Sequence, residues 1–597
     1  MAVATIKSPV TGVVLEVVAE SGQQCQAGDA LLVLESMKVQ IPIALPNVGV
    51  IKNVLVGRGD TVEQGSDLLT YLSAPSTLPE QQGDATGPDE DAPEGTQQSL
   101  QQEARQRREF SEDNARPQAA QRRHSKGFRT ARENLADLMD DGSFDEYGQL
   151  AVAAQRQRRE LQELQIDTAA DGVITGVGTI NAKRFGEQRT RTAVAIYDYS
   201  VLAGTQGFFH HQKLDRIIEV ATNQGLPVIM YTEGGGGRPG DTDVVTMSTG
   251  LHCHSFTAWA GLAGVVPRIA VANGYNFAGN AALFGAADIT IATQSSWIGM
   301  AGPAMIEGGG LGDFRPTEIG PIEVQSANGV VDIVVQDEAA ATRAAQDVLA
   351  VFQGDLRDWH SKDQASLDRA LPENRRYTYD VRAIINTVLD ADSFIELRRG
   401  YGGAVVCGFG RLRGRSIGVL ASDCTVLGGA IDVDAADKAA DFMRLCNNFG
   451  LPLVSLSDTP GFMVGPEHET RGAVRRLSAL FTAGAQLTVP LVGVVLRKCY
   501  GLGAQALLGG STLVPDYTAA WPSGEFGGMG LEGAVKLGFK RELDAQDSAE
   551  QRQALFDKLL EQQYQRGKAV EVATLLEIDA VIQPRDTRGV IARALNY

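Results

Sequence analysis

Glu35-Ser36-Met37-Lys38-Val39-Gln40 is the stretch that decides the fold of the N-terminal part of this chain. The sequences on its two sides repeat one another with a shift of 37 residues, which aligns Pro9 with Pro46, Gly12 with Gly49, Gly22 with Gly59, Gly28 with Gly65 and Leu31 with Leu68. Two short β repeats with glycine turns predict a sandwich of strands with pseudo-twofold symmetry over residues 1–73. Lys38 falls in the tight turn between the halves, where its amine suits covalent modification because it can enter another enzyme's active site.

The Met37-Lys38 pair in this setting resembles the biotinyl (biotin carboxyl carrier) domain, an all-β barrel-sandwich. The resemblance implies biotin bound covalently to Lys38 by a biotin protein ligase, with Met37 as a second cofactor-binding residue. Val39 departs from the usual family pattern, which has a second methionine at this position. Lipoyl domains share the fold but normally lack the methionine before the lysine. Lipoate on Lys38 and an unmodified lysine therefore stay open as alternatives.

The composition of the chain bounds its class. The 597 residues are enough for several domains, because single cores stop growing near about 250–300 residues. The net charge of −19 argues against nucleic acid or an anionic membrane as a partner. The six cysteines have no framework of spacings, residues 1–30 lack a positively charged start followed by an apolar run, so we expect no secretory signal, and no apolar run is long enough to span a membrane. We expect a multidomain cytoplasmic protein without a metal site.

Residues 74–121 differ abruptly in composition from the sequence before them. Pro, Gln, Glu, Asp, Gly and Ser dominate, and residues 88–94 are almost wholly polar. A segment with so few apolar side chains cannot offset its ordering entropy by burial, which predicts a mobile linker. Within it, residues 97–108 have the composition of a transient helix. A flexible tether would let the N-terminal domain travel to a distant site.

A second, longer duplication begins after residue 126. Residues 198–204 recur as 423–429, and shifts of 225 or 224 residues align Lys213 with Lys438, Gly240 with Gly465, Gly279 with Gly503 and Trp297 with Trp521. In each copy apolar strands alternate with amphipathic helices, as in residues 192–197, 213–224 and 226–231. This alternation predicts right-handed βαβ units and a mostly parallel sheet. We expect two α/β domains, residues 122–372 and 373–597.

Each copy has glycine-rich turns at two strand ends, in residues 232–238 and 274–280 of the first copy and in 458–462 and 498–505 of the second. Such turns let backbone N–H groups converge on a small volume without interfering side chains. A pair of donors suits a developing enolate or oxyanion, and losing one donor typically costs about 3–4 kcal/mol. A phosphate site or a simple loop would explain one turn alone. The recurrence of both turns in register favours an oxyanion pocket.

Residues 126–597 resemble the carboxyltransferase subunit of biotin-dependent acyl-CoA carboxylases, a tandem of two crotonase-like α/β domains. The resemblance rests on residues 129–133, 432–434, 458–462 and 497–501. It implies transfer of CO2 from carboxybiotin on Lys38 to the α-carbon of an acyl-CoA. No Ser/His/Asp set or paired carboxylates stand out, which fits a reaction in which biotin removes the α-proton and the protein supplies positioning and oxyanion stabilisation.

The same resemblance assigns roles to the turn residues. It implies that Gly235 and Gly236 hold the acyl thioester oxygen and that Gly503 and Ala504 hold the ureido oxygen of biotin. Substrate contacts are expected from Gly279, Gly461, Phe462 and Ala506. Two departures from the family pattern stand out: Glu233-Gly234 replaces Asp-Ser, and Ala506 replaces an acidic residue of propionyl-type enzymes. The second departure favours a larger or differently shaped acyl group.

The resemblance also implies partners. Biotin enters from the second domain of a partner subunit, so the active unit is at least a dimer, commonly a trimer of dimers. No ATP-grasp region is present, so a separate ATP-dependent biotin carboxylase would load the biotin. Two alternatives stay open: a biotin-dependent acyl-CoA decarboxylase with a membrane partner, and an inactive CoA-binding scaffold that presents the carrier.

Other polar features are interpreted as structural or left undecided. His252-Cys253-His254 alternate on an expected strand without further metal ligands. His210 and His211 precede an expected helix and would contact its start or a CoA phosphate. Lys438 is expected in a surface or inter-subunit ion pair, and Arg238 against a CoA phosphate or a carboxylate.

Overall fold

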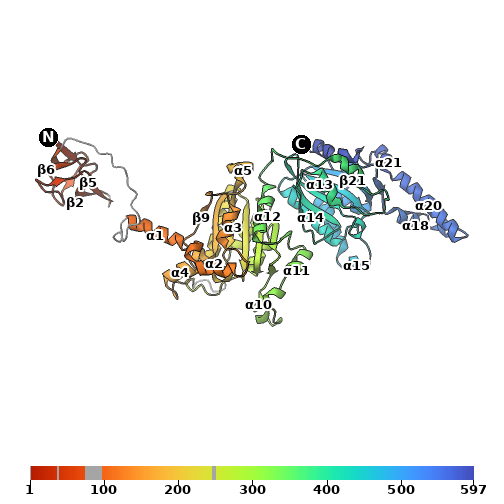
Figure 1. Cartoon of the computed structure of the whole chain (residues 1–597), viewed down its shortest axis with the longest axis horizontal. Helices are drawn as coiled ribbons and strands as arrows, with labels where there is room; N and C mark the ends of the chain where they lie inside the picture. Colours follow the sequence, from red (N-terminus) through yellow and green to blue (C-terminus); the bar gives the residue numbers. More distant parts are fainter. Residues whose placement is uncertain (1, 37–38, 74–96, 245–250) are drawn as a thin grey trace. The chain divides into compact units, whose positions relative to one another are not determined.

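The structure is a computed structural model that describes residues 2–36, 39–73, 97–244 and 251–597. It divides into two compact units, Met1–Glu94 and Gly95–Tyr597 (Figure 1). No helix among the described residues is long and apolar enough to cross a membrane.

The first unit is a sandwich of two antiparallel sheets. Its described residues form the strands β1 (Ala2–Lys7), β2 (Gly12–Val17), β3 (Gln24–Cys25), β4 (Ala30–Ser36), β5 (Val39–Ala44), β6 (Gly49–Val54), β7 (Thr61–Val62) and β8 (Asp67–Ser73). One sheet has the order β1-β8-β6-β3 and the other β5-β4-β2-β7. The shift of 37 residues found in the sequence carries each sheet onto the other. Leu32, Leu34 and Leu69, all fully buried, belong to the core of this unit. The predicted pseudo-twofold β domain is confirmed.

The second unit begins with helices that the sequence analysis placed in a mobile linker. These are α1 (Gln97–Glu109) and α2 (Pro117–His124), joined by the 3₁₀ turn η1 (Asp113–Ala115). Arg116 is buried and its guanidinium lies 2.8 Å from the Asp198 carboxylate. This ion pair ties the start of α2 to the segment around Asp198 in the same unit. The expectation of a mobile linker is therefore wrong for residues 111–121, where Ser111 and Arg116 are buried, whereas α1 has no buried residue. Residues 74–96 lie outside the described part of the chain.

The remainder of the second unit consists of two copies of one α/β fold. The first copy contains α3 (Ala131–Leu138), β9 (Asp145–Tyr147), α4 (Leu161–Asp167), β10 (Val173–Thr179), α5 (Ala182–Phe185), α6 (Glu187–Thr190), β11 (Arg191–Tyr197), α7 (Phe208–Gln224), β12 (Val228–Gly234), α8 (Ser255–Gly261), β13 (Arg268–Phe277), α9 (Gly279–Gly285), β14 (Ile289–Thr293), β15 (Trp297–Gly299), α10 (Pro303–Gly308), α11 (Ile322–Ala327), β16 (Ile333–Val335) and α12 (Glu338–Ala350). The second copy contains α13 (Val381–Val388), β17 (Ile395–Leu397), β18 (Val405–Leu412), β19 (Arg415–Ser422), α14 (Val433–Asn448), β20 (Leu453–Thr459), α15 (Pro466–Glu469), α16 (Ala473–Ala485), β21 (Leu491–Tyr500), α17 (Gly501–Leu507), β22 (Tyr517–Ala520), β23 (Glu525–Gly527), α18 (Leu531–Gly538), α19 (Lys540–Asp544), α20 (Ala549–Arg566), α21 (Ala569–Thr574), β24 (Ala580–Val581) and α22 (Thr587–Ala594).

The two sheets have the same topology. The first has the order β16-β14-β13-β12-β11-β10-β9 with β15 beside β13, and the second has β17-β18-β19-β20-β21-β22-β24 with β23 beside β21. In the first sheet, β10 pairs antiparallel with β9 and β11. In the second sheet, β18 pairs antiparallel with β17 and β19. The other strand pairs in both sheets are parallel. The predicted tandem of mostly parallel α/β domains is confirmed.

Helices cover both faces of each sheet, which explains why strands such as β12 and β20 are buried at every residue. Apolar residues of α3, α12, α14 and α16 belong to one continuous core that includes strands of both copies. Figure 1 shows α12 and α14 in the region where the two copies meet. A second core lies under α7 and α8, and a third under α13 and α22. The two copies therefore form one body.

Candidate functional site

The first glycine turn, residues 234–237, begins at the last residue of β12. Gly234 has a φ of +141° and Gly236 a φ of +88°, a region that favours glycine. A Cβ on Gly234 would lie 2.1 Å from the carbonyl oxygen of Gly204, and a Cβ on Gly236 would lie 2.7 Å from the Cβ of Ala278. The bare sequence of this turn is therefore required by close backbone packing.

The turn between β13 and α9 abuts the first glycine turn. Ala278 has a φ of +53°, which a non-glycine residue adopts only under constraint, and Gly279 begins α9. A Cβ on Gly236 would lie 3.5 Å from the backbone nitrogen of Gly279. Gln206 contacts both turns. Its backbone N–H donates to the carbonyl oxygen of Gly236 at 2.8 Å, and its side-chain Oε1 would lie 2.3 Å from a Cβ on Gly279. Gly236 and Ala278, 42 residues apart in sequence, thus lie in direct contact.

The equivalent turns of the second copy meet in the same way. Gly461, just after β20, has a φ of +114°. A Cβ on Gly503, in α17, would lie 2.6 Å from the carbonyl carbon of Gly461 and 2.7 Å from the backbone nitrogen of Phe462. Matching parallel β-bridges flank the turns and join Gln206 to Gly237 and Ile431 to Phe462. Each copy therefore brings two glycine turns into direct backbone contact.

The predicted site residues differ in how tightly they are held. Gly236, Gly279, Gly461 and Gly503 all lie where the turns touch. Gly235 is less crowded, since the nearest atom to a Cβ there would be a Thr205 methyl group at 3.6 Å.

The residues that follow in α17 are buried. Ala504 is 1% exposed and Ala506 is fully buried. Ala506 belongs to the continuous core beside Leu507, so its side chain packs among apolar residues. Phe462 is partly buried, with its ring 6.2 Å from that of Phe481.

The hairpin of the first unit frames the predicted modification site. Ser36 pairs with Val39 across β4 and β5, which places the end of this strand pair at Ser36 and Val39. The Ser36 hydroxyl donates to the carbonyl oxygen of Thr11 at 2.9 Å, which ties this end of the hairpin to the neighbouring segment. Met37 and Lys38 themselves lie outside the described residues.

A buried carboxylate precedes the first glycine turn of each copy. Glu233 accepts hydrogen bonds from Arg123 at 2.7 and 2.9 Å, and Asp458 lies 2.9 Å from Arg497. The backbone N–H of Lys498 also donates to Asp458 at 3.0 Å. Burial raises the pKa of Glu233 to about 7, against the opposing effect of Arg123. The strand ends that carry the turns are therefore anchored by buried ion pairs.

A cavity adjoins the glycine turn in each copy. The cavity of the first copy has a volume of about 570 Å³ and is lined by Gln206, Gly237, Arg238, His211 and Cys253 among others. The cavity of the second copy has a volume of about 550 Å³ and is lined by Gly501, Ala504, Gln505, Phe526 and Met529 among others. Both volumes lie in the range of small-molecule pockets, about 300–1,000 Å³.

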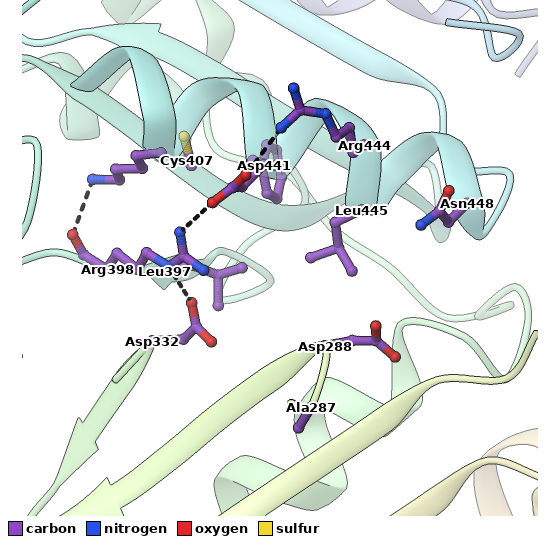
Figure 2. Close-up of a pocket in the computed structure, with 12 residues that line it drawn as sticks. Ala287, Asp288, Asp332, Leu397, Arg398, Cys407, Asp441, Arg444, Leu445 and Asn448 are labelled. Atoms are coloured by element: carbon purple, nitrogen blue, oxygen red, sulfur yellow. Dashed lines mark hydrogen bonds and ion pairs between the residues drawn. The ribbon is translucent and has the colours of Figure 1, made fainter. Parts of the chain in front are cut away.

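A smaller hollow of about 200 Å³ lies between the two copies, and Figure 2 shows its charged side chains turned toward one another. Arg398 lies 2.9 Å from Asp332 and 3.1 Å from Asp441. The Nζ of Lys438 donates to the carbonyl oxygens of Arg398 and Tyr401, each at 3.0 Å. Because these charges satisfy one another and no glycine-turn residue lines the hollow, it is a structural seam.

The structure also places three polar residues that the sequence analysis discussed: Lys438, Arg238 and His210. Lys438 is only 2% exposed, so the expected surface or inter-subunit ion pair is wrong; its Nζ is held by carbonyl oxygens instead. Arg238 does meet a carboxylate, that of Asp171, at 2.5 Å within the same chain. His210 lies inside α7, and its N–H donates to Asp171 at 2.8 Å.

The expected strand at residues 252–254 is not formed, and His254 directly precedes α8. Among the described residues, no three or more His, Cys, Asp or Glu side chains are grouped to hold a metal ion.

The sequence analysis missed Arg123, Gln206 and Ala278. Arg123 lies 110 residues from its partner Glu233, and no pattern in the neighbouring sequence predicts such an ion pair. Gln206 stands between Gly204 and Gly207, and these two glycines were the available signal that the backbone is crowded there.

Known proteins share both units of this chain. Residues 122–597 match the family described as "Carboxyl transferase domain", and residues 4–71 match "Biotin-requiring enzyme". The methylmalonyl-CoA carboxyltransferase 12S subunit of Propionibacterium freudenreichii subsp. shermanii is 32% identical over 80% of this chain and 89% of its own length. The propionyl-CoA carboxylase beta chain of Saccharopolyspora erythraea is 31% identical over 80% of this chain and 89% of its own length.

Solved structures of biotin-dependent carboxylases and transcarboxylases also resemble this chain. A single-chain, multi-domain long-chain acyl-CoA carboxylase superposes with a TM-score of 0.81 at 47% identity, over 99% of this chain and 56% of that one. This chain therefore spans little more than half the length of that enzyme. The transcarboxylase 12S structure, described as a hexamer assembly, superposes with a TM-score of 0.74 at 30% identity, over 85% of this chain and 96% of that one. With its N-terminal unit matching biotin-requiring enzymes, the chain belongs to the carboxyl transferase family of enzymes.

Proposed function

We propose that this chain transfers a carboxyl group from biotin on Lys38 to the α-carbon of an acyl-CoA. The observation that carries the proposal is the contact between two glycine turns at the strand ends of each copy, with a cavity beside each pair of turns. A carboxyl transfer between two carbonyl compounds needs two such pockets, because both reactants carry an oxygen that must be held. The relatives named for methylmalonyl-CoA and propionyl-CoA support an acyl-CoA as acceptor.

The pocket of the first copy would hold the thioester oxygen. Backbone N–H groups of Gly235, Gly236 and Gly279 are the candidate donors, and the contact between the two turns keeps them close together. Charge that develops on this oxygen as the α-carbon loses its proton is stabilised by such donors, each worth about 3–4 kcal/mol. Glycine has no acidic or basic side chain, so these residues act by orientation and hydrogen bonding.

The pocket of the second copy would hold the ureido oxygen of biotin, which supplies the carboxyl group once it is attached to Lys38. Gly503 and Ala504 are the candidate donors, with Gly461 and Phe462 packed against them. The cavity of about 550 Å³ beside this turn has room for a small bicyclic ring. The backbone donors there are fixed by contacts between main-chain atoms, so they need no rearrangement when the ring binds.

The acyl group of the substrate would be longer than propionyl. This point rests on identity, which is 47% to the long-chain acyl-CoA carboxylase against 31% to the propionyl-CoA carboxylase beta chain, because Ala506 is fully buried in the apolar core. A series of acyl-CoA substrates from acetyl- to palmitoyl-CoA tests this point. We expect kcat/KM to rise with chain length, and first rank for acetyl- or propionyl-CoA would contradict it.

The partners follow from the same reaction. A biotin protein ligase would modify Lys38, and a separate ATP-dependent biotin carboxylase would load the biotin. The active unit would be at least a dimer, and the hexamer of the transcarboxylase 12S relative supports a trimer of dimers. These components would meet in the cytoplasm.

The experiment that tests the proposed function starts with protein from its native host. Mass spectrometry of the peptide that spans residues 35–40 should show biotin on Lys38, and the Lys38→Arg variant should lack it. With ATP, bicarbonate and the partner carboxylase, the native protein should form a carboxyacyl-CoA and the variant should not. Lipoate or a bare lysine, or CoA binding without turnover, would overturn the proposal.

Net decarboxylation of the carboxyacyl-CoA without the ATP-dependent partner would reverse the proposed direction of the reaction.

A further inference from the structure

Arg123 and Glu233 form a buried ion pair directly beneath the first glycine turn. Glu233 is the residue before Gly234, and its side chain is 9% exposed, against 11% for that of Arg123. The two guanidinium nitrogens donate to the two carboxylate oxygens at 2.7 and 2.9 Å. A bidentate pair of this kind fixes orientation as well as distance.

The guanidinium of Arg123 is held on every side. Its Nε donates to the carbonyl oxygen of Arg129 at 3.0 Å, and its carbon lies 4.9 Å and 5.5 Å from the ring centres of Phe128 and Tyr199. A second carboxylate, that of Glu338, lies 3.5 Å from the same guanidinium. Arg123 therefore has little freedom to follow Glu233 if the glutamate moves.

The backbone and side chain of Glu233 are also closely confined. A Cβ on Gly274 would lie 2.8 Å from the Oε1 of Glu233, and a Cβ on Gly204 would lie 2.1 Å from its carbonyl oxygen. Both neighbours are glycines, so the carboxylate and the peptide group fill space that side chains would otherwise take. The position of Glu233 thus determines where residues 234–237 begin.

The second copy anchors its turn differently. Asp458 is paired with Arg497 of β21, the strand next to it in the sheet. The strand registers place Gly274 of β13 at the position that Arg497 has in β21, and glycine carries no charge. The first copy therefore lacks an arginine in its own sheet and receives one from α2, which lies outside the duplication.

We propose that Arg123 is a positioning residue of the carboxyl transfer reaction: through Glu233 it holds the first glycine turn in the geometry that binds the thioester oxygen. This inference rests on the proposed function of that turn. Under this proposal, α2, which carries Arg123, helps to shape the acyl-CoA pocket.

The charge of Glu233 gives the pair a pH dependence. Burial raises its pKa to about 7, Arg123 lowers it, and the carboxylates of Glu338 and Asp198 raise it further. The ring of Tyr199 faces the same pair. Wild-type kcat should fall as pH drops below about 7, because the protonated glutamate loses its ionic attraction to the guanidinium. Glu233→Gln should be less active and should lack this limb, since glutamine does not titrate.

The test compares variants of the full-length biotinylated protein in the carboxyl transfer assay. Arg123→Met should lower kcat about 10²-fold, the size of effect known for misplaced catalytic geometry, with a smaller change in KM for acyl-CoA. Arg123→Lys should recover part of the rate, because lysine keeps the charge but not the bidentate contact. Arg122→Met is the matched control, since Arg122 is exposed on the same helix.

The same variants are also compared by hydrogen exchange of residues 234–238, which needs no activity. Exchange should be faster in Arg123→Met and unchanged in Arg122→Met. Equal kcat in these two variants, or equal exchange, would overturn the proposal. If Arg123→Met does not fold, the double variant Arg123→Met/Glu233→Gln, which removes both charges of the pair, takes its place, and a wild-type kcat there would also overturn it. An inactive wild-type protein would refute the proposed function, while the exchange data would still decide the role of Arg123.

Discussion

The two copies of the α/β fold place the same kind of turn at the same strand end but support it in different ways. In the second copy, Asp458 is held by Arg497 from the adjacent strand, so the support belongs to the sheet itself. In the first copy, Glu233 is held by Arg123 from a helix that precedes the repeat. A duplicated fold can thus keep the geometry of a turn while the groups that stabilise it come from another part of the chain. The first turn should accordingly respond to changes in the N-terminal segment, and the second should not.

The largest expected effect concerns the contact between paired turns. Gly503→Ala should lower kcat about 10³-fold, because its Cβ would overlap backbone atoms of Gly461 and Phe462 and displace the donors. Gly236→Ala should act similarly in the first copy, where the Cβ would meet Ala278 at 2.7 Å. Steady-state kinetics, with circular dichroism to verify folding, measures both.

Gly235→Ala is the matched control for these variants. The nearest atom to its Cβ would lie at 3.6 Å, an ordinary contact, so activity should stay within about threefold of wild type. If Gly235→Ala were as damaging as Gly236→Ala, the contact between turns would not be the reason for the loss.

Both duplications could be found in the sequence because glycine and proline mark turns at fixed spacing. The shift of 37 residues aligned Gly12 with Gly49, and these glycines begin β2 and β6, which occupy equivalent places in the two sheets. The shift of 225 aligned Lys213 with Lys438, which lie in α7 and α14 of the two copies. Local signals of this kind depend only on neighbouring residues, and so the fold was predictable.

The supports of the site were less predictable, because they depend on contacts between distant segments. Arg123 stands in a polar sequence at the edge of the expected linker, and its burial follows only from the position of Glu233 110 residues later. Lys438 was expected at the surface because lysine usually is, yet its Nζ reaches two carbonyl oxygens in the seam between the copies. A charged residue that is buried by tertiary contacts has no distinct pattern of its own.

The second prediction concerns the stability of the two anchors. Arg497→Met should lower the free energy of unfolding by about 3 kcal/mol, because it leaves the buried carboxylate of Asp458 without its guanidinium. Arg123→Met should lower it by only about 1 kcal/mol, since α2 can detach locally from the N-terminal edge of its unit. Urea unfolding measures both, and Arg475→Met, at an exposed position, is the control. Equal losses for Arg123→Met and Arg497→Met would remove the difference between the copies.

The third prediction uses the equivalent buried lysines. Burial lowers the pKa of Lys213 to about 8, and it also lowers the pKa of Lys438. Above pH 8 the unfolded chain keeps its proton on Lys213 while the folded chain releases it, so stability should rise by about 2 kcal/mol from pH 8 to pH 10 on account of this group. Lys213→Met should lose that increase, and Lys183→Met, at an exposed position, should keep it. An unchanged pH dependence in Lys213→Met would mean that burial does not perturb this lysine.

The smallest effect is expected at the helix caps that begin each copy. Thr130 caps α3 in a capping box with Glu133, and Asp380 caps the equivalent helix α13 through the N–H of Arg382. Alanine at either position should lower the free energy of unfolding by about 1 kcal/mol. The loss should be greater for Thr130→Ala, because its hydroxyl also donates to Asp113 at 2.5 Å and so holds the segment that carries Arg123. Hydrogen exchange of residues 234–238 should increase in Thr130→Ala and not in Asp380→Ala. The opposite result would mean that the first turn does not depend on the N-terminal segment that Thr130 holds in place.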